Sequence, residues 1–205
     1  MRPGCASALA LLLTMLAVAP AAAHHTGTYT PRDNAITTNF KEVKFSVQAG
    51  KFDVARRLFD DGPLRREMRA RAAALPDGLE ARTRAAFDAG NAADVERGLM
   101  VFFAALGRDL ALEADRQLAA GAAPAPTGAR FLEAIWRYYN LVDFAVSRRD
   151  AGASVAMRLA YDDAETLVRP ATVPAAVISP RVRESFRRIA SILAGIIQAP
   201  PAPVR

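Results

Sequence analysis

Apolar side chains recur every three or four residues along most of this chain, a period that predicts helices rather than strands. From Thr38 to Asp61 the period is interrupted once, at Gly50, which predicts a helical hairpin. Further helices are predicted at 64–75, 79–89, 95–118, 131–146 and 155–168, and a last one should begin at Pro180, capped by Ser179, and end before Pro200.

Glycines mark several of the predicted turns. Gly50, Gly90 and Gly152 each follow an alanine and precede a Val and a Leu spaced four residues apart. The first of these turns is similar to the inner turn of a tetratricopeptide hairpin, although the spacings of 40 and 62 residues do not match a fixed repeat of about 34. A left-handed glycine that closes each helix explains the likeness, so the turns predict hairpins rather than a regular solenoid.

The chain is therefore predicted to be all-α, an irregular bundle of about seven helices built from helical hairpins. We expect a signal peptide at 1–23, an extended arm at 24–37, a single helical domain at 38–199 and a Pro-rich tail at 200–205. The residues expected in the core include Phe102, Leu106, Ile135, Val142, Leu159, Phe186 and Ile189.

The N-terminal segment has the pattern of a secretory signal. An uncharged apolar run follows Arg2, and Ala21 and Ala23 supply the small residues that signal peptidase needs, so His24 is the expected first residue after cleavage. No later apolar run approaches the roughly 18 residues that cross a bilayer. The sequence thus predicts a periplasmic protein with no transmembrane segment after cleavage.

Composition narrows the possible functions. The formal net charge is +6, but export makes a nucleic-acid partner improbable. The only Cys lies in the predicted signal peptide, and both His residues lie at 24 and 25. Nucleophilic triads, zinc-peptidase sites and the Glu-x-x-His di-iron motif therefore have no residues to build them, and neither a P-loop nor a dinucleotide fingerprint is present. We expect a protein that is not an enzyme.

Carboxylates on the apolar faces of three predicted helices are the candidate metal ligands. At about 100° per residue, Asp109 and Glu113 fall on the stripe of 95–118, Asp143 beside that of 131–146, and Asp163 at the centre of that of 155–168. If these helices run antiparallel, Asp109, Glu113, Tyr139 and Asp163 share one layer roughly 6 Å thick, with Asp143 one turn away. Oxygen ligands of this kind suit iron, manganese, magnesium or calcium.

Arginine offers a second way to neutralise the same carboxylates. Nearly all basic residues are Arg, and Arg71 falls on the apolar face of 64–75. A guanidinium that pairs with inward carboxylates removes the need for a cation. The sequence leaves both arrangements open.

The predicted mature N-terminus is a separate candidate metal site. His24 would present its α-amino group and its imidazole as a chelate for copper, with His25 beside it. A histidine brace takes another imidazole from elsewhere in the fold, and this chain has none. We expect adventitious metal affinity here rather than a dedicated copper site.

Two functions follow from these observations. The chain is expected to be an exported binding or accessory protein that handles a hard metal cation through its inward carboxylates. The alternative is a tetratricopeptide-like module of helical hairpins that binds a partner protein and no metal.

Overall fold

The computed structural model describes residues 32–120, 127–168 and 175–199, with side chains from 180 onward in the last segment. The predicted signal peptide and the predicted Pro-rich tail lie outside the described residues. The described residues form an all-α fold with eight α-helices, one 3₁₀ turn and no strand. The α-helices are α1 (Ala35–Gln48), α2 (Phe52–Asp61), α3 (Pro63–Ala70), α4 (Leu79–Asp88), α5 (Ala92–Ala119), α6 (Thr127–Arg149), α7 (Ala151–Val168) and α8 (Ala175–Gln198).

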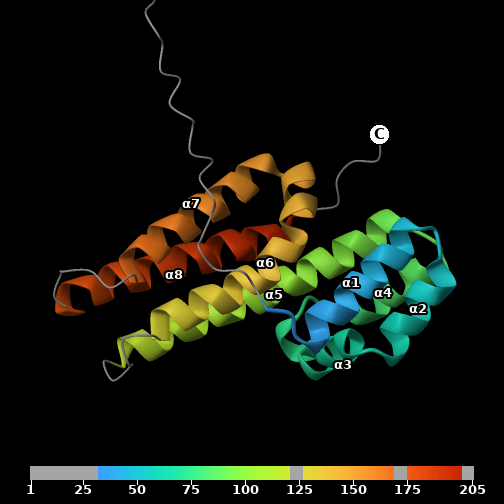
Figure 1. Ribbon diagram of the computed structural model, residues 1–205, viewed down its shortest axis with the longest axis horizontal. Coiled ribbons are helices and arrows are strands. Elements are labelled where there is room, and N and C mark those ends of the chain that lie inside the picture. The colour runs from blue at the N-terminus through green and yellow to red at the C-terminus, as the bar shows by residue number, and fades with distance from the viewer. Residues whose placement is uncertain (1–31, 121–126, 169–174, 200–205) are drawn as a thin grey trace, which may run out of the picture.

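The long helix α5 connects two groups of helices (Figure 1). On one side α5 packs against α4 and α1, which in turn contact α2 and α3. On the other side α5 packs against α6 and α8, and α7 packs on those two helices. Consistent with this central place, ten consecutive residues of α5, Gly98 to Gly107, are buried, on every side of the helix. A helix that is apolar on every side is typical of the centre of a fold.

The predicted core is correct except on α7. Phe102, Ile135, Phe186 and the other expected residues of α5, α6 and α8 are buried, but Leu159 is 54% exposed. Helix α7 instead buries a face that includes Met157, Ala160 and Ala164. Small side chains allow the close approach of neighbouring helices, so the alanine face faces inward and the larger leucine is left in solvent.

The first helix begins earlier than predicted. Helix α1 includes residues 35–37, which were assigned to the extended arm. Asn34 provides the start signal, because its side chain accepts a hydrogen bond from the Thr37 backbone N–H at 2.9 Å while the Thr37 hydroxyl accepts one from the Asn34 N–H. This reciprocal pair is a capping box that uses Thr in place of the usual Glu or Gln.

A buried asparagine joins α1 to the next two helices. The side-chain N–H of Asn39 donates to the Leu58 carbonyl at 3.0 Å, and its carbonyl oxygen accepts from the Leu64 N–H at 3.2 Å. Both partners are backbone groups at the break between α2 and α3, where Gly62 leaves no room for a side chain against Asn39. Asn39 thus satisfies the orphan groups of two helix ends and fixes the hairpin.

The turns follow the predicted chemistry at two of the three glycines. Gly50 and Gly90 have φ of 72° and 63°, in the left-handed region that closes a helix. Gly152 is different, since it already lies inside α7. Asp150 makes that turn instead, by accepting a 2.9 Å hydrogen bond from the Ala153 N–H as the cap of α7.

The start of α8 was also misplaced. The helix begins at Ala175, and Pro180 lies inside it rather than at its first position. Pro180 is the sixth residue of α8, beyond the first four residues whose N–H groups have no intrahelical partner, so its missing N–H removes one backbone hydrogen bond from the second turn. The residues that follow Pro180 form the apolar face that packs on α5 and α7.

Candidate functional site

The two carboxylates predicted to face inward from α5 are partly exposed and paired with arginine. Asp109 accepts a hydrogen bond from Arg108 at 2.7 Å, and Arg71 lies 3.8 Å away on the other side. Arg71 is thus the partner that the arginine alternative named, although its side chain is 42% exposed rather than buried. Asp109 already has guanidinium groups on both sides.

Glu113 is satisfied within its own helix. Arg116 donates to it at 2.7 Å and the Gln117 amide at 2.6 Å. The hydrogen bond from Arg116 is the main reason why the pKa of the Glu113 carboxyl lies below its ordinary value. A low pKa of this origin indicates a solvated helix pair at i,i+3 spacing and no buried charge.

Asp163 does not face the core. Its side chain is 61% exposed and forms a 3.0 Å ion pair with Arg188 of α8. The wheel of α7 had placed it at the centre of the apolar stripe, and that placement was wrong for the same reason as for Leu159: the buried face of α7 is turned toward Met157 and Ala164. Asp163 therefore does not share a layer with Glu113.

Tyr139 and Asp143 are the two predicted ligands that the structure brings together. Tyr139 is fully buried and Asp143 nearly so. Asp143 accepts a hydrogen bond from Ser154 at 2.9 Å and pairs with Arg158, both of α7. Burial, with a smaller contribution from the charge of Asp143, raises the pKa of the Tyr139 phenol above its ordinary value, so the phenol keeps its proton at neutral pH.

The arrangement of these residues favours the arginine alternative. Each of the four carboxylates has at least one guanidinium partner, and no group of three or more His, Cys, Asp or Glu side chains among the described residues is placed to hold a metal ion. His24 and His25 lie outside the described residues, so the copper prediction stays a prediction.

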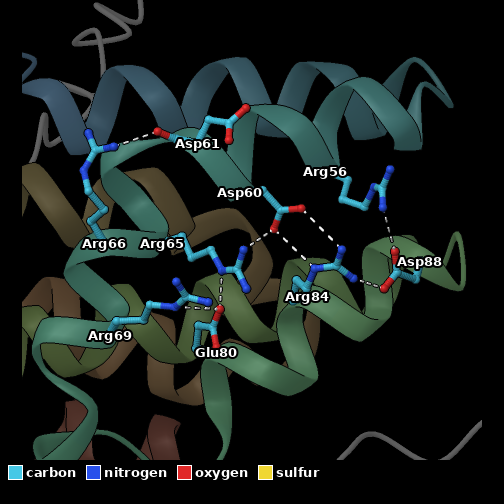
Figure 2. A network of polar contacts seen from close by, with 9 residues as sticks. All are labelled: Arg56, Asp60, Asp61, Arg65, Arg66, Arg69, Glu80, Arg84 and Asp88. Carbon is cyan, nitrogen blue, oxygen red and sulfur yellow. Dashed lines mark hydrogen bonds and ion pairs between the residues drawn. The ribbon is translucent and has the colours of Figure 1, made fainter.

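Helices α2, α3 and α4 carry a second cluster of charges, which the sequence analysis did not single out (Figure 2). Arg65 bridges Asp60 of α2 and Glu80 of α4, and Arg84 bridges Asp60 and Asp88. Each of these carboxylates has at least one guanidinium partner. The cluster thus joins three helices electrostatically and is better explained as a structural network than as an anion-binding site.

A concave site lies between α1, α5 and α6. Two turns of each helix enclose about 330 Å³, near the lower end of the range for ligand pockets. Most of the lining is apolar: Phe40 and Val47 from α1, Ala92, Val95 and Leu99 from α5, and Leu141, Val142, Phe144 and Ala145 from α6. The polar members are Lys44, Gln48, Glu96 and Arg148. We refer to this site as the α1–α5–α6 groove.

Phe144 gives this groove an unusual edge. Its side chain is 67% exposed although it lines the groove, and the Arg148 guanidinium lies 5.3 Å from its ring centroid. Arg148 also pairs with Glu96 across the groove. A large aromatic residue held at the mouth of an apolar groove is typical of binding surfaces rather than of an isolated exposed residue.

One signal in the sequence could have found this site. Phe144 lies off the stripe of Ile135, Tyr139, Val142 and Val146 that buries α6, so its apolar side chain had no predicted partner. The groove itself needs α1 beside α6, and these helices are about 100 residues apart in the chain. Periodicity within one helix carries no information on such a pairing.

Among the described helices, none combines the length and apolarity that a membrane crossing requires. Comparison with known protein families, with curated proteins and with solved structures gives no match for this chain. The function must therefore be inferred from the side chains of the described residues.

Proposed function

We propose that this chain is a non-catalytic binding protein that takes up a partner protein in the α1–α5–α6 groove. The observation that carries the proposal is Phe144, a large aromatic side chain two-thirds exposed at the edge of an apolar groove. Aromatic residues in such positions dominate the energetics of protein interfaces. The predicted signal peptide would make the periplasm the place of binding.

The remaining chemistry supports binding rather than catalysis. The polar residues that line the groove are a lysine, a glutamine and the Glu96–Arg148 ion pair, which do not form a nucleophile–base pair. The alternative of a cation site has less support, because the carboxylates predicted to face inward already pair with arginine. A helical interaction module fits both the groove lining, which has no nucleophile–base pair, and the carboxylates that pair with arginine.

Site-specific photocrosslinking in the cells that make the protein tests this proposal. A photoreactive residue at Gln48, an exposed member of the groove lining, should form an adduct of one defined mass. Phe144→Asp should abolish that adduct by placing a charge at the apolar edge. Leu112→Asp is the matched control, because Leu112 is 51% exposed on α5 but roughly 20 Å along the helix from the groove.

Loss of the adduct with Phe144→Asp and its retention with Leu112→Asp would support the proposal. An adduct that survives Phe144→Asp, or no adduct at all from Gln48, would contradict it.

A further inference from the structure

The apolar surface continues past the groove onto α7. Ser154 donates a hydrogen bond to Asp143 at 2.9 Å, so these two residues face each other across the α6–α7 hairpin. The two helices are antiparallel and both are right-handed. The residue that follows Asp143 in α6 and the residue that follows Ser154 in α7 therefore point to the same side of the hairpin. Phe144 and Val155 therefore lie on one side of the hairpin.

Leu159 extends this side by one turn of α7. It lies four residues after Val155, and the two side chains are 54% and 55% exposed. Together with Phe144 they form an outer apolar strip that adjoins the mouth of the groove. A surface that combines a groove and an adjoining strip is larger than a pocket-sized ligand covers, and contiguous apolar patches of this kind mark sites for macromolecules.

The charges at the groove leave one cation without a counter-ion. Arg148 pairs with Glu96, and Arg158 beside the strip pairs with Asp143. Lys44 forms no ion pair with any described residue; its ammonium lies 5.8 Å from the centroid of the Phe40 ring, within the groove lining. An ammonium beside apolar surface interacts more strongly with an added carboxylate than one in open water.

Helical geometry best suits an occupant of this groove. The walls are two turns of α1 and α6, about 12 Å long, with α5 as the floor. The described residues contain no strand and hence no sheet edge to which an extended peptide could add. An amphipathic helix that lies in a helical groove uses apolar anchors at i, i+3 or i+4, and i+7.

Building on the proposed function, we infer that the partner segment is an amphipathic helix that places an acidic side chain against Lys44 and covers Phe144, Val155 and Leu159. The apolar anchors supply most of the affinity. The carboxylate selects the partner and its orientation, since charge complementarity contributes more to specificity than to affinity.

Three labelled peptides of about 16 residues test this inference by fluorescence anisotropy with the purified protein. They share one amphipathic helical sequence and differ at a single position beside the apolar stripe, which holds Glu, Gln or Lys. The Glu peptide should bind about two- to fivefold more tightly than the Lys peptide, the range of an ion pair at a partly exposed site. Lys44→Glu should reverse this order.

Two control variants separate the parts of the argument. Lys51→Glu changes the charge of an exposed lysine outside the groove lining and should leave the order of affinities unchanged. Phe144→Asp should weaken binding of all three peptides, and Val155→Asp and Leu159→Asp should each do so to a smaller extent.

The outcomes distinguish the two proposals. Equal affinities for the three peptides, with binding that still depends on Phe144, would overturn the inference about Lys44 and leave the proposed function intact. Binding that ignores Phe144 would overturn both. Phosphatidylglycerol vesicles that bind in a Lys44-dependent way, where no peptide does, would identify an anionic membrane surface as the partner and overturn the inference.

Discussion

The hydroxyl of Ser154 donates a 2.9 Å hydrogen bond to the buried carboxylate of Asp143, which also pairs with Arg158. Asp143→Ala should lower the free energy of unfolding by about 1–3 kcal/mol, because a hydrogen-bonded charge is lost next to the buried Tyr139. Asp163→Ala is the control, since its pair with Arg188 is more than half exposed and should contribute less than about 1 kcal/mol.

Urea denaturation of both variants, with and without a chelator, measures these differences. The arginine pairing predicts that the chelator changes neither result. A bound cation would give a different result, because a ligand stabilises only the state that binds it. The chelator would then lower the stability of the unaltered protein but not that of Asp163→Ala. That outcome would support a cation at the carboxylates predicted to face inward.

The orientation of α7 is tested by two neighbouring truncations. Met157 is fully buried and Leu159 is 54% exposed. Met157→Ala should cost about 2–5 kcal/mol of stability, the usual range for a buried methionine. Leu159→Ala should lie within about 0.5 kcal/mol of the unaltered protein. Urea denaturation of both variants measures the difference. A larger loss of stability in Leu159→Ala than in Met157→Ala would show that α7 buries the face with Leu159, as its apolar periodicity predicts.

Two helical glycines should respond in opposite ways to alanine. A methyl group on Gly98 of α5 would overlap the Thr83 hydroxyl of α4, whereas one on Gly195 of α8 would have no neighbour within 4 Å. Gly98→Ala should therefore destabilise the protein by about 1–2 kcal/mol through overpacking. Gly195→Ala should stabilise it by up to about 1 kcal/mol through helix propensity. Thermal unfolding of both variants checks the pair; a melting temperature for Gly98→Ala at or above that of the unaltered protein would contradict the close packing of α4 on α5.

The network in Figure 2 predicts that Arg65 contributes to stability. Its side chain is 16% exposed and pairs with Asp60 and Glu80 on two other helices. Arg65→Met should cost about 1–3 kcal/mol, because two partly buried carboxylates lose a shared guanidinium. Arg57→Met is the control. Arg57 and Asp53 are 63% and 74% exposed and 3.9 Å apart, so loss of this ion pair should lower the free energy of unfolding by less than about 0.5 kcal/mol. Similar costs for the two variants in urea would show that Arg65 is no more than a surface charge.

The pKa of Tyr139 predicts a loss of stability in alkali. Burial raises this pKa above the value of about 10 in the unfolded chain, so above pH 10 the unfolded state releases a proton that the folded state keeps. The free energy of unfolding then falls with a slope of up to about 1.4 kcal/mol per pH unit. Tyr139→Phe should fall less steeply between pH 10 and 11.5. Parallel slopes for the two proteins would mean that Tyr139 ionises normally in the folded state.

Local sequence was enough to predict the fold class and much of the core. A 3.6-residue period requires only that one face of each helix is buried, and Phe102, Ile135 and Phe186 lie on such faces whatever packs against them. The turns at Gly50 and Gly90 were equally predictable, because few other residues adopt a left-handed backbone without strain.

Contacts between helices decided the rest. In α7 the period is ambiguous, since alanines recur on more than one face, and only close packing on neighbouring helices selects Met157 over Leu159. A helical wheel places a carboxylate near the core but does not show which guanidinium reaches it, and each of the four carboxylates predicted to face inward pairs with an arginine. The α1–α5–α6 groove likewise exists only because α1 and α6, about 100 residues apart in the chain, both contact α5, an arrangement set by long-range packing rather than by the pattern within any one segment.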